Sequence, residues 1–304
     1  MLRTRFLHDG WEFSAARWLT PTRRMGYSVM EWMPATVPGH VHLDLVRHGV
    51  ISDPFGELSE LGCQWVDEED FVFRTSFDWK SDPMLPKRLL RFEGLDTLAR
   101  VSLNGELVAE HENMFVPLEI DVTERLRNGK NELEVTLASA ARVGRERRAR
   151  YFASEGLSED LLRFEERAFV RKAQYMFGWD WGPRLASAGI WRPVALVEHA
   201  GRLVDVAISQ EHRPDGSVLL GFSSKVDGTG EVVHFVEGIE KGIRDGETCV
   251  IEKPKLWWPA GHGPQALLAV TSVFGAKALA TRAEMEGSAF DRRRTHVGLR
   301  TVRL

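Results

Sequence analysis

The sequence is poor in cysteine, since Cys63 and Cys249 are the only two among 304 residues. Two cysteines so far apart form neither a C-x-x-C pair nor a disulfide framework, which excludes a small disulfide-stapled secreted scaffold. We interpret both as buried small hydrophobic residues. This usage is typical of a reducing compartment, and we expect a cytoplasmic location.

Long apolar runs are also missing. No run approaches the roughly 20 residues that cross a bilayer, and the start, "MLRTRFLHDGWEF", lacks the apolar core of a secretion signal. We therefore expect a cytoplasmic chain with no membrane partner.

The net charge of -4 argues against a general nucleic-acid binder. The one dense basic run, "RVGRERRAR", is followed by the acidic "SEGLSEDLLRFEE" and indicates a solvated, partly helical surface.

Several motifs of enzyme chemistry are absent. There is no Gly-rich phosphate loop, no H-E-x-x-H, no G-x-S-x-G and no Cys/His cluster with zinc spacing. The nearest metal candidate is "GHVH", where His40 and His42 would share one face of an extended segment, but no third ligand is near. Packing or hydrogen bonding is the favoured role for both. We expect no metal and no organic cofactor.

Strand patterns dominate the chain. In "FVFRTSF", Phe71, Phe73, Thr75 and Phe77 fall on one face, and "LEVTL" alternates apolar and polar residues in the same way. "ARVSLNGELVAE" has Asn104-Gly105 between alternating apolar residues, the strongest short signal for a two-residue hairpin turn. The sequence therefore predicts half-buried antiparallel strands.

Helical patterns are few. "VHLDLVRHG" predicts two turns of helix closed by Gly49, and "LSEDLLRFEERAF" predicts a helix capped by Ser158. Many short strands with few helices favour a sandwich or barrel. The character of the strands changes near residue 199, and the remaining 105 or so residues have the size of an immunoglobulin-like sandwich. We expect two domains, with a boundary there.

The stretch "QYMFGWDWGPRLASAGIWRP" raises a functional question. Trp179, Asp180 and Trp181 are followed at once by Gly182 and Pro183, a pair that ends regular structure and favours a turn. A carboxylate between two indoles can accept hydroxyl hydrogen bonds and cover an apolar ring face, and a sugar offers both. The alternative is structural: both indoles are core wedges and the aspartate caps the turn.

Several further segments follow one another along the chain in the same order as in a known protein family. They are "PGHVHLDLVRHGVISDPF", "LRFEGLDTLARVSLNGE", "NMF", "DVTERLRNGKNELEVTLASA", "RKAQYMFGWDWGPRLASAGIWRP", "LWWPAGHGPQAL" and "VGLRTVRL". Together they resemble β-mannosidases of glycoside hydrolase family 2, collinearly over nearly the whole chain. The segment from Arg171 to Pro193 is the most specific, and "LWWP" and "GLRTV" are usual marks of the family's second domain.

The resemblance implies an architecture. Such proteins begin with a jelly-roll, galactose-binding-like sugar-binding domain, continue with an immunoglobulin-like β-sandwich, and then enter a (β/α)8 barrel that carries two catalytic glutamates. It implies that residues 1–199 are the jelly-roll domain and residues 200–304 the immunoglobulin-like domain. No room is left for a barrel of roughly 250 residues. We therefore expect no catalytic residue in this chain and no activity from the chain alone.

The resemblance also implies site residues. It places the Trp-Asp-Trp-Gly loop at the mouth of the barrel, where Asp180 binds mannoside hydroxyls and Trp179 or Trp181 supplies a platform. Arg171 and Lys172 open the motif, and either brace Asp180 as counter-charges or are solvated. Ser59 stands where these enzymes often carry Asn, which weakens any sugar contact from its loop. Trp257 and Trp258, in "LWWP", are interpreted as packing residues.

Three functions are compatible with these observations. The first is the N-terminal substrate-binding and scaffold part of a retaining β-mannosidase, which hydrolyses terminal non-reducing β-mannosyl residues with glutamates supplied by a barrel partner. The second is a free-standing carbohydrate-binding module, and the third is an interaction module. A reading frame that continues into a barrel would favour the first.

Overall fold

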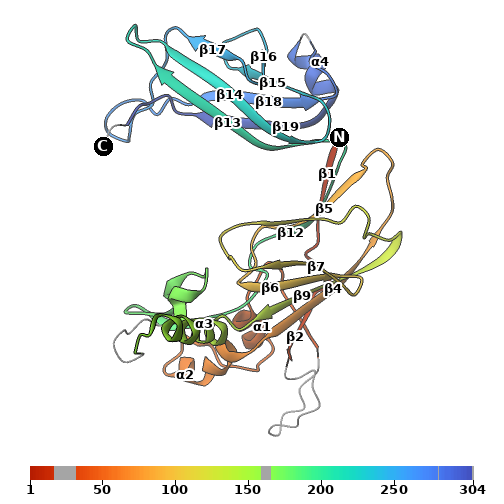
Figure 1. Cartoon of the computed structure of the whole chain (residues 1–304), viewed down its shortest axis with the longest axis vertical. Helices are drawn as coiled ribbons and strands as arrows, with labels where there is room; N and C mark the ends of the chain where they lie inside the picture. The colour runs from red at the N-terminus through yellow and green to blue at the C-terminus, as the bar shows by residue number, and fades with distance from the viewer. Residues whose placement is uncertain (17–31, 159–165, 280, 303–304) are drawn as a thin grey trace. The chain divides into compact units, whose positions relative to one another are not determined.

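The chain folds into two compact units, each built from β-sheets. The computed structural model describes residues 1–16, 32–158, 166–279 and 281–302. The first unit consists of Thr4–Ser81 and Arg88–Val197, and the second of Met1–Arg3, Asp82–Lys87 and Glu198–Leu304. Figure 1 shows strands as the main elements of both units, so the prediction of an all-β chain is confirmed.

The first unit contains a six-stranded and a four-stranded sheet. The six-stranded sheet has the order β3 (Met33–Pro34), β2 (Glu12–Ala15), β4 (Phe71–Trp79), β9 (Gly129–Ala138), β6 (Leu98–Leu103) and β7 (Glu106–His111). The four-stranded sheet has the order β1 (Leu2–Phe6), β12 (Val194–His199), β5 (Lys87–Phe92) and β8 (Leu118–Asp121). Both sheets contribute side chains to one apolar core, as in a β-sandwich.

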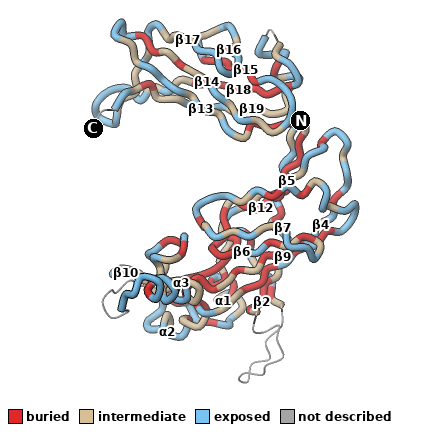
Figure 2. Tube along the Cα trace, in the orientation of Figure 1, coloured by how far each residue is buried: buried red, intermediate tan, exposed pale blue. Residues whose placement is uncertain are grey.

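The predicted alternation is confirmed in the central strands. On β4, Phe71 and Phe73 are fully buried, while Arg74, the next residue along the strand, points to the other face and is exposed. Phe73 lies opposite Val135 of β9, which is also buried. Burying such a side chain stabilises the fold by about 1.5–3 kcal/mol. Figure 2 shows buried residues concentrated along the strands of each unit.

The Asn104-Gly105 turn is confirmed as well. Leu103 of β6 pairs with Glu106 of β7, which leaves these two residues as the turn. Both have positive φ, 54° for Asn104 and 84° for Gly105, as a two-residue hairpin requires. The Asn104 amide also donates to the backbone oxygen of Arg125, so this turn is tied to the neighbouring loop.

The helical elements of the first unit are short, apart from one. They are α1 (Val41–Arg47), α2 (Ser59–Cys63), the 3-10 helix η2 (Gln64–Glu68), α3 (Ala140–Glu155), and the 3-10 helices η3 (Glu166–Phe169) and η4 (Gln174–Met176). The helix predicted over 41–49 is confirmed, with Gly49 at a φ of 67°. In the segment predicted as a helix after Ser158, residues 159–165 lie outside the described residues. Its end, η3, is a 3-10 helix.

Helix α3 carries the basic run. It begins after Ser139, whose side chain accepts a hydrogen bond from the backbone N–H of Arg142. Its arginines contact carboxylates of other segments: Arg142 pairs with Asp70, Arg145 with Glu68 and Arg147 with Glu112. The positive charge of the run is therefore compensated on the protein surface.

The second unit is a smaller pair of sheets. One has the order β13 (Arg202–His212), β14 (Val218–Asp227) and β17 (Thr248–Ile251). The other has the order β16 (Ile243–Arg244), β15 (Glu231–Val236), β18 (Leu268–Gly275) and β19 (Ala289–Val297), with α4 (Arg282–Gly287) before the last strand. Leu220 and Phe222 of β14 pack with Val270 of β18 in its core.

Two expectations about single residues can be checked here. Cys63 is buried as expected, but Cys249 is only partly buried, because it lies on β17 at the edge of its sheet. The packing role of the two tryptophans is confirmed. A Cβ at Gly263 would come within 2.7 Å of the Trp258 ring, and one at Gly298 within 3.1 Å of Trp257.

Candidate functional site

The Trp-Asp-Trp segment forms a small hairpin in the first unit. Strand β10 (Phe177–Trp179) pairs with β11 (Gly182–Arg184), and Trp179 lies opposite Gly182. Asp180 and Trp181 are therefore the two turn residues. The sequence folds this way because Gly178 takes a φ of 97°, which favours glycine. The backbone N–H of Leu185 also donates to the carbonyl of Met176, 3.0 Å away, and extends the pairing by one step.

The turn presents its side chains outward. Trp179 is 50% exposed and Trp181 is 74% exposed, so neither is a core wedge. Asp180 is also exposed, and its carboxylate makes no hydrogen bond or ion pair with any residue that the structure describes. The structural alternative for this segment is therefore wrong: the indoles do not fill the core and the aspartate does not cap the turn.

Aromatic and cationic neighbours support the two indoles. The Trp181 ring lies 6.4 Å from that of the exposed Tyr175, and the Arg167 guanidinium carbon lies 5.5 Å from the Trp179 ring. Such contacts restrict the rotamers of exposed tryptophans. The turn thus combines an unengaged carboxylate with apolar ring faces, which is the chemistry needed to bind a polyhydroxylated ring.

The two basic residues that open the motif have different environments. Arg171 is exposed, its backbone bridges to Asn113, and its guanidinium has no ion pair within the described part of the chain. No contact joins it to Asp180. Lys172 is only 2% exposed, and its Nζ lies 2.5 Å from Asp96 Oδ2. Both alternatives for Lys172 are therefore wrong, because it is neither solvated nor a counter-charge for Asp180.

Lys172 belongs to a buried polar cluster beneath the motif. Its Nζ also donates to the Ser187 carbonyl at 2.6 Å, and the Ser187 hydroxyl lies 2.8 Å from His42 Nδ1. Burial, with the nearby charges of His40 and Lys172, lowers the pKa of His42 to about 4. Burial also lowers the pKa of Lys172, and the Asp96 carboxylate opposes this change.

His40 and His42 do not form the extended pair that the sequence suggested. His40 immediately precedes α1 and His42 lies within it. Among the described residues there is no group of three or more His, Cys, Asp or Glu side chains that could hold a metal ion. His40 lies 3.8 Å from Asp96 Oδ2 and stacks near Trp191 instead. Asp96 is thus a common neighbour of His40 and Lys172, which residue spacing in the sequence could not have identified.

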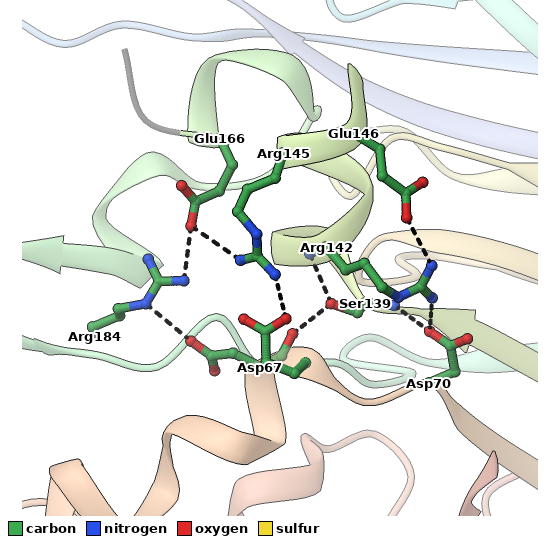
Figure 3. Close-up of polar contacts among 9 residues, drawn as sticks. Asp67, Asp70, Ser139, Arg142, Arg145, Glu146, Glu166 and Arg184 are labelled. Atoms are coloured by element: carbon green, nitrogen blue, oxygen red, sulfur yellow. Dashed lines mark hydrogen bonds and ion pairs between the residues drawn. The ribbon is translucent and has the colours of Figure 1, made fainter. Parts of the chain in front are cut away.

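A network of ion pairs adjoins the hairpin (Figure 3). Arg184, the last residue of β11, contacts Glu166 of η3 and Asp67 of η2. Burial raises the pKa of Asp67 to about 6, although the Ala186 backbone and the Arg184 charge act in the opposite direction. Arg145 of α3 shares Glu166 with Arg184.

Ser59 lines a cavity of about 440 Å³. Cys63, Trp65 and Leu58 line it as well, and no residue of the Trp-Asp-Trp turn does. The interpretation of the Ser59 loop as the weaker candidate for a sugar contact stays a prediction.

The second unit contains an arrangement that resembles a nucleophile site. The Ser272 hydroxyl lies 2.8 Å from His234 Nδ1, and His234 Nε2 lies 3.1 Å from Asp245 Oδ1. Ser272 and His234 are both fully buried, so no substrate reaches the hydroxyl. Because Ser272 and His234 also pair across β18 and β15, the arrangement is a structural cross-strand contact.

Comparison with known proteins identifies the relatives of the chain. Residues 11–192 match the family described as "Glycosyl hydrolase 2 galactose-binding domain-like". The chain is 31% identical to "Beta-mannosidase B" of Aspergillus terreus over 97% of its own length and 35% of that protein. It is 34% identical to "Beta-mannosidase B" of Thermothelomyces thermophilus over 86% of its length and 31% of that protein.

Solved structures give the same picture. The crystal structure of a β-D-mannosidase from Dictyoglomus thermophilum matches with a TM-score of 0.79 and 32% identity, over 97% of this chain and 36% of that one. A β-D-glucuronidase from the same organism matches at 18% identity with a TM-score of 0.60, which shows a shared fold alone. The chain spans about a third of the length of these relatives.

No helix among the described residues is long and apolar enough to cross a membrane.

The family match covers more than half of the chain and includes the hairpin with Trp179, Asp180 and Trp181. The chain therefore belongs to glycosyl hydrolase family 2, through its galactose-binding domain-like unit, as its tryptophan-rich motif predicted.

Proposed function

We propose that this chain is the N-terminal substrate-binding and scaffold part of a retaining β-mannosidase. In this proposal residues 1–199 are a jelly-roll sugar-binding domain and residues 200–304 an immunoglobulin-like domain, and a (β/α)8 barrel packs on them. The barrel supplies both catalytic glutamates, which act on terminal non-reducing β-mannosyl residues through a glycosyl-enzyme. The chain alone is expected to be inactive. The unpaired Cys63 and Cys249 support a cytoplasmic location, which stays a prediction.

One observation carries the sugar-binding role. The Asp180 carboxylate stands on an exposed two-residue turn without a partner among the described residues, between two exposed indoles. An ionised carboxylate accepts two charge-assisted hydrogen bonds from sugar hydroxyls, and an indole covers the apolar C–H face of the ring. We assign Asp180 the hydroxyl contacts and Trp179 or Trp181 the ring face. Arg171, whose guanidinium is exposed, is a second ligand in this proposal.

The test uses the chain labelled with 5-fluorotryptophan. The resonances of Trp179 and Trp181 are assigned with Trp179→Phe and Trp181→Phe, and methyl β-mannoside is added at millimolar concentration. We expect at least one of the two resonances to shift with the β-mannoside, to shift less with methyl α-mannoside or methyl β-galactoside, and not to shift in Asp180→Asn. An equal response in Asp180→Asn, or none in the original chain, would contradict the assignment.

A second measurement tests where catalysis resides. The purified chain is incubated with 4-nitrophenyl β-mannoside, and release of nitrophenol is followed. No release is expected. Turnover that copurifies with the chain would show that the acid and the nucleophile lie within these residues. Tight binding of β-mannosides by the isolated chain would instead favour the free-standing carbohydrate-binding module.

A further inference from the structure

The hairpin of β10 and β11 is too small to hold its own shape. Each strand has three residues, and the two strands pair only with each other in the described sheets. Isolated two-stranded hairpins are marginally stable in water. Trp179 and the turn residue Trp181 are exposed, so the core does not fix the tip of the hairpin, whereas Phe177 at its base is buried in an apolar cluster with Val170 and Ala186. The position of the turn must therefore be set by contacts at the base of the hairpin.

Arg184 makes the polar contacts at the base of the hairpin. Its Nη2 lies 2.8 Å from Glu166 Oε1 and its Nε lies 3.4 Å from Asp67 Oδ2. Its carbonyl accepts a hydrogen bond from the side-chain amide of Gln64, at 2.9 Å. Across the hairpin it pairs with Phe177, and its guanidinium carbon lies 5.6 Å from that ring. Figure 3 shows the guanidinium reaching both carboxylates.

The environment of these contacts makes them stronger than a surface ion pair. Asp67 is only 2% exposed, and the side chain of Glu166 is 13% exposed, while that of Arg184 is 31% exposed. Removing the cation would leave a buried carboxylate with less compensation, which costs more than losing an exposed pair. Arginine suits this place because its guanidinium presents several N–H donors in a rigid planar fork, so that Nη2 faces Glu166 while Nε faces Asp67.

We propose that Arg184 is the positioning residue of the Trp-Asp-Trp turn, with Glu166 and Asp67 as its anchors. It fixes the base of the hairpin to η2 and η3 and so sets where the Asp180 carboxylate stands. It touches no substrate itself. The inference rests on the proposed function only for the role of Asp180, and the order of the hairpin is measured without a sugar.

The experiment compares Arg184→Gln with Arg145→Gln in the full 304-residue chain. Arg145 also contacts Glu166, but it stands on α3 and not on the hairpin, so it is the matched control. Amide hydrogen exchange is followed by mass spectrometry in peptides that cover the hairpin and in peptides from β4 and β9. In Arg184→Gln we expect at least tenfold faster exchange in the hairpin and unchanged exchange in the two strands.

Further variants separate positioning from general stability. Arg184→Lys should give an intermediate exchange rate, because it keeps the charge and reaches one carboxylate. Should Arg184→Gln fail to fold, Glu166→Gln provides the test, since it keeps Arg184 beside Asp67. Faster hairpin exchange in Glu166→Gln supports the proposal. Hairpin exchange within twofold of the original chain, or the same acceleration in Arg145→Gln, overturns it.

Addition of methyl β-mannoside distinguishes the two proposals. A hairpin that loosens in Arg184→Gln supports the positioning role even when the fluorotryptophan resonances of the original chain do not respond to the sugar. In that case the sugar-binding role of Asp180 is contradicted and the positioning role of Arg184 is retained. A sugar response that is retained with full strength in a folded Arg184→Gln chain overturns the positioning role and leaves the sugar-binding role standing.

Discussion

Lys172 and Asp96 form a fully buried ion pair, with Nζ 2.5 Å from Oδ2 and neither side chain exposed. The pair ties the segment that enters the Trp-Asp-Trp motif to the loop that precedes β6. The backbone carbonyl of Ser187, which follows the hairpin, accepts a hydrogen bond from the same Nζ. The two ends of the motif are therefore anchored to one ammonium group.

Replacing this lysine should be costly. We expect Lys172→Met to lower the free energy of unfolding by about 3–5 kcal/mol, because it leaves Asp96 as an uncompensated buried charge. The control is Arg147→Met, which removes the partly exposed pair with Glu112 and should cost at most about 1 kcal/mol. Urea unfolding of both variants measures the difference. Equal losses in the two variants would contradict the prediction.

His42 should make the fold sensitive to acid. The pKa of the buried imidazole is lowered to about 4, whereas that of an unfolded histidine is about 6.5. Below pH 6.5 the unfolded state binds a proton that the native state refuses, so stability falls as the pH drops toward 4. The contribution is on the order of 3 kcal/mol. Urea unfolding between pH 4.5 and 7 should show a shallower loss for His42→Gln, and identical slopes would exclude this role.

Asp67 should act in the opposite direction. Its native pKa is raised to about 6, above the unfolded value of about 3.9, so the native state keeps a proton that the unfolded state loses. Its contribution to stability therefore falls as the pH rises from about 4 to 6. Carbon-13 NMR titration of the Asp67 carboxyl should give a midpoint near 6. In Arg184→Gln this midpoint should be higher, because the Arg184 charge lowers the pKa of Asp67. Arg142→Gln, which removes the partner of Asp70, should leave it unchanged. A midpoint below about 4.5 would refute the burial argument.

The exposed apolar side chains around α2 should cause self-association. Phe55 is 76% exposed, Leu58 75% and Leu61 64%, all within seven residues. Grouped apolar surface of this kind is usually covered by a partner. Static light scattering should give an average mass that rises above 34.4 kDa with concentration. The double change Phe55→Ser and Leu58→Ser should abolish the rise, and Leu107→Ser, at a solitary exposed leucine, should not. A constant monomer mass would count against the prediction.

The features that sequence predicted are local ones. Alternation placed Phe71, Phe73 and Val135 correctly because a strand repeats every two residues, and Asn104-Gly105 fixed its turn through backbone conformation alone. The Gly182-Pro183 pair indicated a turn near Asp180, but these two residues lie in β11, and the turn falls on Asp180 and Trp181 before them. These patterns act over a few residues and need no knowledge of the rest of the chain.

The errors concern partners that are distant in sequence. Lys172 stands beside Arg171 in the sequence and looks equally solvated, yet its partner Asp96 is 76 positions away. In the same way, nothing near Arg184 points to Asp67. A charged side chain is buried or exposed according to which segments the fold brings beside it, and residue spacing carries no such information. The candidate turn could thus be predicted, but its supporting contacts could not.

The two-residue turn also limits how the loop can vary in length. Surface loops usually tolerate insertions and deletions, but side chains on a strand alternate between faces. A third turn residue is accommodated if the loop lengthens and Phe177 stays opposite Arg184. If the insertion instead shifts the register of β11 by one residue, Arg184 turns to the opposite face, out of reach of Glu166 and Asp67. Insertions at this tip should therefore be tolerated when they lengthen the turn and penalised when they shift the strand pairing.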